Sequence, residues 1–489
     1  MSKSKTLDVY YKTRHVGTLA EMADKRIAFQ YDREWIKNGF SISPLSLPLS
    51  NEVFVPNERS RDRFGGLFGV FSDSLPDSWG ELLLDRYLGS IGINRKDIST
   101  LDRLAYIGTS GMGALEYIPA KNIDYDVVGS KLNFDEIAKE CSALLSSNIS
   151  DQINVLYKLG GSSGGTRPKV FLSEEGKEWI VKFPAEKDPG ISGKREYDYS
   201  VCAKKCGITM TETQLVNSAV CEGYFKTERF DRQNGKKIFT TTFAGILEAD
   251  FRAPSCDYET FMRLTRGLTK ENHTDKEQMF KIMCFNVMTH NLDDHTKNFS
   301  FKYTEDLGWR LAPAYDLTYS TTYWGEHTTS VNGKGTNILD EDLIHIGIVS
   351  GIKEGICKEY LNEIKENTQE LSDYINNTYP KRKKMSVKNR ILDLNDSKAE
   401  LMETLWHEYF NMDKEKRKGI EWEGEKYRPA VFDDKYLAEC EKEGRKPDKK
   451  ILDHFWKNCV EIQGYTPKYC SIPKEADKGE IRCRKSKIV

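Results

Sequence analysis

The sequence predicts an α+β protein with a mixed N-terminal half and a mainly helical C-terminal half, and three observations lead to that prediction. β-type alternation of apolar and polar residues opens the chain at residues 7–11. Two further strand-like runs, 170–172 and 179–184, are separated by a short turn that contains a glycine, which indicates a hairpin. From about Pro254 to Tyr379 apolar residues recur at helical spacing, with one interruption at 290–325.

Helices and strands alternate in the N-terminal half. A second strand is expected at 26–31, and a helix at 79–88 follows Asp77, a residue type that is common at helix starts. Further helices are expected at 134–146 and at about 194–206, where apolar residues share one face.

Composition and charge describe an ordinary protein with no bias toward one kind of partner. The chain has 489 residues, 38% of them hydrophobic and 30% charged, with a formal net charge of −2. That balance excludes a general basic coat for nucleic acid, and no apolar run reaches the roughly 18 residues that a membrane span needs. The N-terminus lacks the apolar segment of a signal peptide and the eleven cysteines include no CxxC pair. We therefore expect a cytoplasmic protein with reduced thiols and no membrane contact.

The stretch from Asp293 to Asp316 carries the residues with the clearest chemistry. An apolar helix leads into a polar loop that holds Asp293 and, five residues later, Asn298; a predicted hairpin then ends near Asp316. An Asp, an Asn and a second Asp in this order form the catalytic layout of protein kinases. A hydroxyl is a poor nucleophile, so a carboxylate such as Asp293 must orient it and accept its proton. Asn298 and Asp316 offer the oxygen ligands that Mg²⁺ needs when it bridges ATP phosphates.

Two alternatives apply to this stretch. Asp294 stands next to Asp293, but the five-residue spacing to Asn298 selects Asp293. Asp and Asn also favour turns. In the alternative interpretation, Asp293, Asp294 and Asn298 only form a turn and take no part in catalysis. The position of Asp316 after the returning strand favours phosphoryl transfer over that interpretation.

A glycine- and serine-rich segment at 160–169, the glycine-rich loop, precedes the hairpin that carries Lys182. Glycines let backbone N–H groups approach phosphate closely, although this loop matches neither the Walker pattern nor GxGxxG, and such segments are also common flexible connections. Lys182 lies in an apolar strand, where an unpaired ammonium is costly to bury. An ATP phosphate and Glu196 of the next helix would offset that cost. The alternative for Lys182 is an outward-facing position on the strand.

Residues Glu228, Arg229 and Phe230 close a strand and are candidates for the hinge whose backbone contacts adenine. By themselves they are only a strand end before a turn. The order along the chain, however, is glycine-rich loop, lysine, helix, hinge, helices, catalytic loop and metal-binding aspartate, which is the order of a kinase. We therefore expect a bilobal protein-kinase-like fold with a mixed α/β N-terminal lobe and a mainly helical C-terminal lobe.

Five segments resemble the HipA family, the kinase toxins of bacterial toxin–antitoxin systems. They are Gly164-Gly165-Thr166-Arg167-Pro168-Lys169, Val181-Lys182-Phe183-Pro184, Glu228-Arg229-Phe230-Asp231-Arg232, Asp293-Asp294-His295-Thr296-Lys297-Asn298-Phe299-Ser300 and Ala314-Tyr315-Asp316-Leu317. The resemblance extends from near the N-terminus to about residue 378, and the last two segments are its most specific part.

The resemblance implies a serine/threonine protein kinase with a HipA-type fold that uses ATP and Mg²⁺. It also implies neutralisation by a small helix-turn-helix antitoxin, with DNA bound only through that partner. Family members phosphorylate an aminoacyl-tRNA synthetase, which makes a protein of that class the implied substrate. They silence themselves by autophosphorylation of a serine in the glycine-rich loop, which here is Ser162 or, as the second choice, Ser163.

Carried over to this sequence, the resemblance makes Asp293 the catalytic residue and Asn298 and Asp316 the Mg²⁺ ligands. The implied ATP-binding residues are Gly164, Gly165, Thr166, Arg167, Pro168, Lys169, Lys182, Glu228, Arg229, Phe230 and His295.

Four segments are expected along the chain. Residues 1–105 resemble the family's leading subdomain, 106–235 complete the N-terminal lobe, and 236–379 form the helical lobe with the catalytic loop. Residues 380–489 have no counterpart in the resemblance. They are dense in Lys and Glu but contain aromatic residues, so we expect an appended, mainly helical region of unknown role.

Two other functions are compatible with the sequence. The chain would be a non-catalytic partner in a DNA-binding repressor complex if it did not bind Mg-ATP, although the retained Lys182, Asp293, Asn298 and Asp316 argue against that. It would be a kinase-like small-molecule phosphotransferase if the acceptor were not a protein. The leading subdomain and the segment at 164–169 favour the protein kinase instead.

Overall fold

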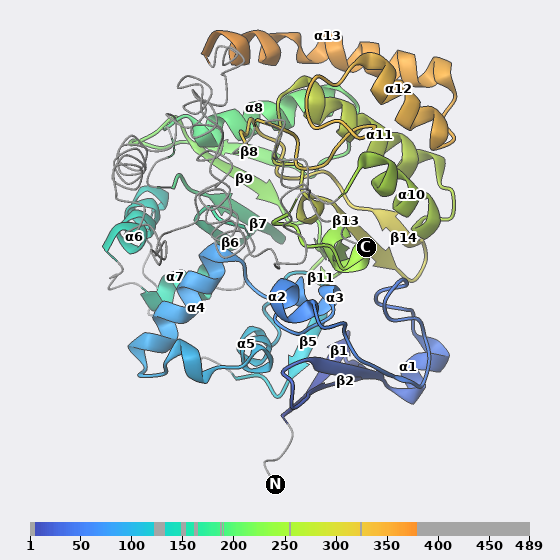
Figure 1. Cartoon of the computed structure of the whole chain (residues 1–489). Helices are drawn as coiled ribbons and strands as arrows, with labels where there is room; N and C mark the ends of the chain where they lie inside the picture. Colours follow the sequence, from blue (N-terminus) through green and yellow to red (C-terminus); the bar gives the residue numbers. More distant parts are fainter. Residues whose placement is uncertain are drawn as a thin grey trace, which may run out of the picture. The chain divides into compact units, whose positions relative to one another are not determined.

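The computed structural model describes most of the chain between Lys5 and Thr378 (Figure 1). The described residues are 5–121, 133–147, 153–160, 165–185, 188, 190–253, 256–322 and 325–378. Three of the predicted site residues, Ser162, Ser163 and Gly164, lie outside the described residues, and so does the predicted helical region 380–489.

The predicted strands and helices that fall in the described part of the chain are present in the predicted order, among further elements that were not predicted. The strands are β1 Thr6–Tyr11, β2 Arg14–Glu21, β3 Ile27–Tyr31, β4 Val53–Phe54, β5 Leu115–Ile118, β6 Lys169–Glu174, β7 Lys177–Lys182, β8 Thr213–Val216, β9 Tyr224–Glu228, β10 Arg232–Gln233, β11 Lys236–Lys237, β12 Phe239–Thr242, β13 Ser300–Thr304 and β14 Gly308–Leu311. The helices are α1 Arg33–Asn38, α2 Ser60–Phe64, α3 Gly69–Ser72, α4 Ser78–Ser90, α5 Thr100–Ile107, α6 Phe134–Ser147, α7 Ile153–Gly160, α8 Ser192–Lys205, α9 Phe243–Leu247, α10 Tyr258–Leu268, α11 His273–Met288, α12 Asp340–Val349 and α13 Glu354–Thr378, with short 3-10 turns η1 Arg95–Asp97 and η2 Thr296–Asn298. The helices predicted at 79–88, 134–146 and about 194–206 correspond to α4, α6 and α8.

The N-terminal sheet has the strand order β4-β3-β2-β1-β5, and each neighbouring pair in it is antiparallel. Its burial pattern follows the alternation in the sequence, since Leu7, Val9 and Tyr11 are buried and the residues between them are more exposed. Trp35 of α1 is buried beside this sheet, and its indole N–H donates to the Phe40 carbonyl (2.9 Å).

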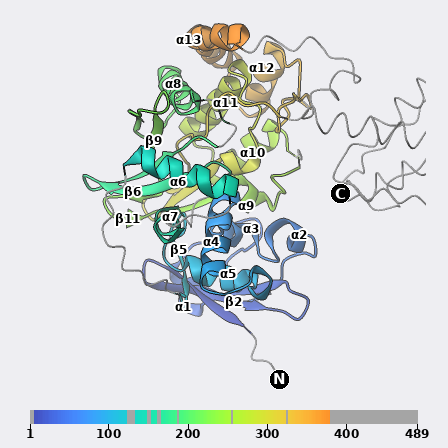
Figure 2. The same ribbon diagram turned by 90° about the vertical axis from the view of Figure 1, so that its left-hand side faces the viewer.

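The second sheet, in the order β6-β7-β9-β8, contains the predicted hairpin that ends at Lys182. β6 and β7 pair antiparallel with Val170 opposite Val181, and β7 pairs antiparallel with β9. Both valines are buried in a core that also contains Trp79 of α4 and Leu156 of α7. In Figures 1 and 2, α4 lies beside α7, and its Asp85 pairs with Arg103 of α5, a helix that packs on β1 and β5 of the first sheet.

The helical part holds a third sheet, β12-β13-β14. β13 and β14 form the hairpin predicted between Asn298 and Asp316, with Phe301 opposite Leu311. Both of these apolar residues lie in a large core to which α8, α10, α11, α12 and α13 also contribute. In both views α12 and α13 lie at the end of this unit away from β1 and β2 (Figures 1 and 2).

The predicted α+β class is confirmed, because sheets and helices mix before β12 and helices predominate after it. Across the described part of the chain, no helix is both long and apolar enough to cross a membrane.

Candidate active site

Lys182, Glu196 and Asp316 meet although they come from three separate elements. Lys182 is the last residue of β7, Glu196 lies in α8, and Asp316 follows β14. The Lys182 Nζ is 2.6 Å from the Glu196 Oε1 and also forms an ion pair with the Asp316 carboxylate. Because Lys182 and Asp316 are 134 residues apart in sequence, only tertiary packing creates this cluster.

The charges of this cluster stabilise one another in a largely buried place. The Lys182 and Glu196 side chains are only 12% and 4% exposed. Burial opposes the charged form of Lys182, but the Asp316 and Glu196 carboxylates outweigh it and raise the pKa of Lys182 above its ordinary value. Burial also opposes the charge on Asp316, yet the Lys182 and Lys169 ammonium groups hold the pKa of Asp316 below its ordinary range. Lys182 and Asp316 are therefore both charged at neutral pH.

Lys169, the first residue of β6, adds a second cation to the cluster. Burial and the neighbouring Lys182 charge lower the pKa of Lys169 to about 8, while Asp316 and Glu196 favour its charged form. Gly165 lies directly against it, since a Cβ at Gly165 would stand 2.6 Å from the Lys169 Nζ. Gly165 also has φ +85°, a conformation that favours glycine. The site thus combines a close backbone approach with two lysines, which suits a polyphosphate.

Polar contacts hold the described part of the glycine-rich loop. The Arg167 Nε is 2.9 Å from the Asp188 Oδ2, and the Pro168 carbonyl accepts a hydrogen bond of 2.8 Å from the Phe183 N–H. Thr166, between these anchored positions and Gly165, is exposed. The loop therefore leaves the hydroxyl of Thr166 accessible to a ligand.

The loop after α11, residues 293–298, is called the catalytic loop. Its Asp293 side chain is 57% exposed. Its backbone is fixed, since the Asp293 N–H donates to the Ser320 Oγ (2.9 Å) and the Asn298 Nδ2 donates to the Asp293 carbonyl (2.6 Å). The His295 Nε2 lies 3.8 Å from the Asp293 Oδ1. Partial burial raises the pKa of Asp293, the His295 charge opposes the rise, and the negative charge of Asp316 adds to it. A raised pKa makes the Asp293 carboxylate a stronger base.

Asp294, the neighbouring carboxylate, is fully buried and has structural partners. Its Oδ2 accepts a hydrogen bond from the Tyr258 hydroxyl (2.9 Å) and lies 2.8 Å from the His327 Nδ1. Its Oδ1 accepts a hydrogen bond from the Thr329 N–H (3.0 Å). Of the adjacent pair, Asp293 is the one whose carboxylate faces solvent.

Tyr315 connects the turn before Asp316 to the hinge candidates. Its hydroxyl donates to the Lys297 carbonyl (2.8 Å) and shares a hydrogen bond with the Ser300 Oγ (2.6 Å). Its ring stacks on Phe230 with the centroids 5.4 Å apart. Asp316 itself has φ +54°, so the backbone that presents its carboxylate lies in the left-handed region. Phe230 and the catalytic loop are thus joined through one aromatic side chain.

Arg229, one of the hinge candidates, is engaged in the fold. Its backbone N–H donates to the Glu178 carbonyl (2.8 Å), and its buried guanidinium pairs with both carboxylate oxygens of Asp231 (2.9 and 2.8 Å). The Arg229 side chain therefore stabilises the turn after β9. The hinge of Glu228, Arg229 and Phe230, whose backbone would contact adenine, stays a prediction.

Asp77 and Lys297, which were not among the predicted site residues, also belong to this site. The Lys297 Nζ is 2.6 Å from the Asp77 Oδ1 and lies 4.5 Å from the centroid of the Phe251 ring. The other oxygen of Asp77 accepts a hydrogen bond from the Gly165 N–H (3.2 Å). The signal for Lys297 was its place just before Asn298. No local signal points to Asp77, because its partner Gly165 is 88 residues away.

The residues present fit Mg²⁺ bound together with a nucleotide. Asn298 and Asp316 offer amide and carboxylate oxygens, and Mg²⁺ in kinase sites uses one or two such ligands together with phosphate oxygens and water. Lys169 and Lys182 place positive charge beside Asp316, as polyphosphate binding requires.

A lysine–glutamate pair on a mixed sheet region and an Asp–Asn–Asp set on a helical region define a kinase-like α+β protein with two lobes. The family follows from direct comparison. Residues 7–118 match the HipA N-terminal domain, and residues 161–371 match the HipA-like C-terminal domain. The chain belongs to the HipA family.

Relatives with kinase names share this similarity. Y4mE of Sinorhizobium fredii, a protein named as a kinase, is 26% identical over 348 residues, which cover 65% of this chain and 78% of the relative. The serine/threonine-protein kinase toxin HipA of Shewanella oneidensis is 24% identical over 358 residues, which cover 66% and 77%. The solved structure of the Shewanella oneidensis MR-1 HipA, HipB and operator DNA complex matches with a TM-score of 0.57 at 19% identity, covering 77% of this chain and 92% of that chain, which shows the shared fold. The relatives' names support kinase-type activity in general terms.

Proposed function

We propose that this chain is an ATP- and Mg²⁺-dependent serine/threonine protein kinase and the toxin of a toxin–antitoxin pair. The observation that carries the catalytic part is the meeting of Lys182, Glu196 and Asp316, because a lysine paired with a helix glutamate beside a metal-binding aspartate is the nucleotide-binding arrangement of kinases. The Asp293 side chain is partly exposed, so an acceptor hydroxyl can reach it, and its partial burial raises its pKa. Both properties suit a base that accepts the proton of a hydroxyl.

In this proposal the nucleotide-binding residues each have one task. Lys182, oriented by Glu196, binds phosphate together with Lys169, and the backbone of the glycine-rich loop covers it. Asn298 and Asp316 hold the metal. When bound, Mg-ATP supplies the phosphoryl group that is transferred and the cation that neutralises its charge.

Asp293 acts on the acceptor. Its backbone is clamped by Ser320 and Asn298, so the carboxylate has a defined direction. It orients the hydroxyl of a serine or threonine and receives the proton as the hydroxyl oxygen attacks. His295 lies near enough to Asp293 to influence its charge and remains a predicted ATP contact.

The exchange of Asp293 for Asn tests the catalytic assignment. Asp293→Asn keeps the shape but removes the base, so we expect phosphate transfer from ATP to fall about 100–1,000-fold. Incorporation of labelled phosphate, with and without Mg²⁺, measures the effect. Asp306→Asn, an exposed aspartate in the turn between β13 and β14, is the matched control and should retain wild-type rates. Undiminished transfer by Asp293→Asn would show that another group is the base.

The toxin part of the proposal rests on family membership and on the relatives. A Shewanella oneidensis relative is named a kinase toxin, and the matching structure contains HipB and operator DNA. We propose a small helix-turn-helix antitoxin as the partner, DNA contact through that partner, a protein substrate such as an aminoacyl-tRNA synthetase, and autophosphorylation at Ser162 or Ser163. The same variant pair extends the test: wild type should arrest growth and carry phosphate on one of these serines, and Asp293→Asn should do neither.

A further inference from the structure

Asp77 stands at the N-cap position of α4, yet its side chain does not cap that helix. An aspartate at this position ordinarily accepts a hydrogen bond from the first turn of its own helix. Here one carboxylate oxygen accepts from the Gly165 N–H (3.2 Å) and the other lies 2.6 Å from the Lys297 Nζ. The carboxylate therefore serves two segments that lie 88 and 220 residues further along the chain.

Trp79, two residues further along α4, holds the glycine-rich loop through separate contacts. Its backbone N–H donates to the Gly165 carbonyl (3.3 Å), and its indole N–H donates to the Lys169 carbonyl (3.2 Å). Both backbone polar groups of Gly165 are thus tied to the start of α4. Because the Trp79 side chain is 1% exposed, this support is part of the packed core.

Lys297, on the other side of Asp77, is confined. Its ammonium group lies over the Phe251 ring and pairs with Asp77, and its carbonyl accepts from the Tyr315 hydroxyl. Asp73, four residues before Asp77, is a second carboxylate near Lys297. Burial raises the pKa of Asp73, and the Lys297 charge acts against that rise. Lys297 directly precedes Asn298, so the contacts that hold Lys297 also restrain the backbone of the predicted metal ligand.

From this geometry we infer that Asp77 is a positioning residue for phosphoryl transfer, which couples the glycine-rich loop to the catalytic loop through Gly165 and Lys297. The inference rests on the proposed kinase function. It makes α4 of the N-terminal domain a component of the active site. Loss of the Asp77 carboxylate should then disturb both the glycine-rich loop and the catalytic loop.

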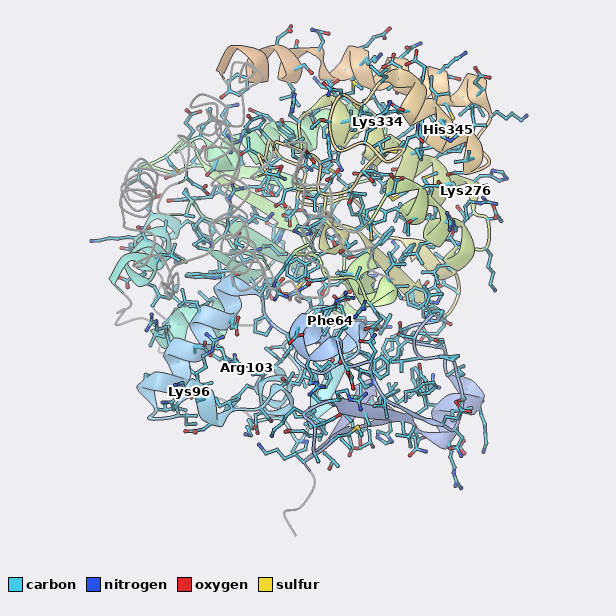
Figure 3. The ribbon with its side chains drawn as sticks, in the orientation of Figure 1. Phe64, Lys96, Arg103, Lys276, Lys334 and His345 are labelled. Atoms are coloured by element: carbon cyan, nitrogen blue, oxygen red, sulfur yellow. The ribbon has the colours of Figure 1, made fainter. Side chains whose placement is uncertain are left out.

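Two substitutions separate the two contacts. Asp77→Asn removes the charge that pairs with Lys297 but keeps an oxygen that accepts from the Gly165 N–H. Asp77→Ala removes both. Asp85→Asn is the matched control in the same helix, since Asp85 pairs with Arg95 and Arg103 away from this site (Arg103 is labelled in Figure 3).

Two measurements read these variants. In steady-state kinetics we expect kcat to fall about 10–100-fold in Asp77→Asn with KM for Mg-ATP little changed, and KM to rise in addition in Asp77→Ala. In hydrogen–deuterium exchange without nucleotide, peptides that contain Gly165 should exchange about 10-fold faster in Asp77→Ala, and at the wild-type rate in Asp77→Asn and Asp85→Asn.

The outcomes distinguish this inference from the proposed function. Wild-type exchange at Gly165 in Asp77→Ala, or wild-type kcat in Asp77→Asn, overturns the positioning role. An equal loss in Asp77→Asn and Asp85→Asn also overturns it, because the effect would then be general to α4. A wild-type protein that transfers no phosphate overturns the proposed kinase, while the exchange data still decide whether Asp77 holds the loop.

Discussion

Two adjacent aspartates, Asp293 and Asp294, have the same side chain but different surroundings. Asp294 is buried among Tyr258, His327 and Thr329, whereas the Asp293 carboxylate is exposed above a fixed backbone. Sequence spacing favoured Asp293, but it contained no information on the partners of Asp294, because those partners come from distant segments. The same holds for a buried arginine at the hinge, which no local pattern distinguishes from one that meets a ligand.

Glu196 offers a prediction at this scale. Glu196→Gln keeps the size of the side chain but removes one of the two charges that hold Lys182, so Lys182 would be drawn toward Asp316. We expect phosphate transfer to fall about 10–100-fold with a raised KM for Mg-ATP, measured by steady-state kinetics. Asp198→Asn, which breaks an exposed ion pair on the same helix, should leave both parameters unchanged. Equal effects of the two changes would argue against a role for Glu196 in the site.

Among the elements, those with strong local patterns were predicted well. The alternation in β1, the apolar face of α6 and the two hairpins at 169–182 and 300–311 are all present. β12 was not predicted, since its Phe-Thr-Thr-Thr sequence is short and its strand character depends on pairing with β13. Such elements are specified by their neighbours and not by their own residues.

Two short helices, α3 and α9, meet at a carboxyl group that responds to pH. Burial raises the pKa of Glu248 to about 7, although the Gly69 N–H, the Ser46 hydroxyl and Arg63 favour its charged form and Asp73 opposes it. The folded protein therefore keeps a proton that the unfolded chain releases near its ordinary value of 4.5. Stability should fall as pH rises from about 4.5 to about 7, by at most about 3 kcal/mol from this group.

Glu248→Gln checks this expectation. The amide cannot ionise, so the part of the pH dependence that comes from Glu248 should disappear, and urea denaturation at pH 5 and pH 7.5 measures it. Glu341→Gln, an exposed glutamate of α12, is the control. A pH profile identical to wild type would contradict the raised pKa.

In the molecule as a whole, the core beneath the N-terminal sheet extends onto the third sheet, because Phe239 of β12 belongs to it and Tyr303 of β13 and Trp309 of β14 pack against it. Phe40 stacks on Tyr303 of β13 with the centroids 3.7 Å apart, and Phe239 and Trp309 contact the same cluster. The Tyr11 hydroxyl also donates to Glu305 (3.3 Å). The leading subdomain therefore belongs to the same compact unit as the helical part.

A double-mutant cycle on Phe40 and Tyr303 tests this shared core. Phe40→Ala should lower the free energy of unfolding by about 3 kcal/mol, because it leaves a cavity in a packed aromatic cluster. Combined with Tyr303→Ala, the two losses should fall short of additivity by about 1 kcal/mol, measured by urea denaturation. Leu45→Ala, at an exposed position, should change stability little. Strict additivity would show that the two rings do not interact.

Periodicity and short spacings predict the α+β class, the order of the main predicted elements and the candidates Asp293, Asn298 and Asp316, because both are local properties of the chain. Tertiary packing brings Lys182 to Asp316, and Asp77 to Lys297 and the Gly165 N–H. These pairs depend on burial and on segments 88 to 220 residues apart. Local sequence does not encode such contacts, because the free energy that favours them arises only when the packed core brings the segments together.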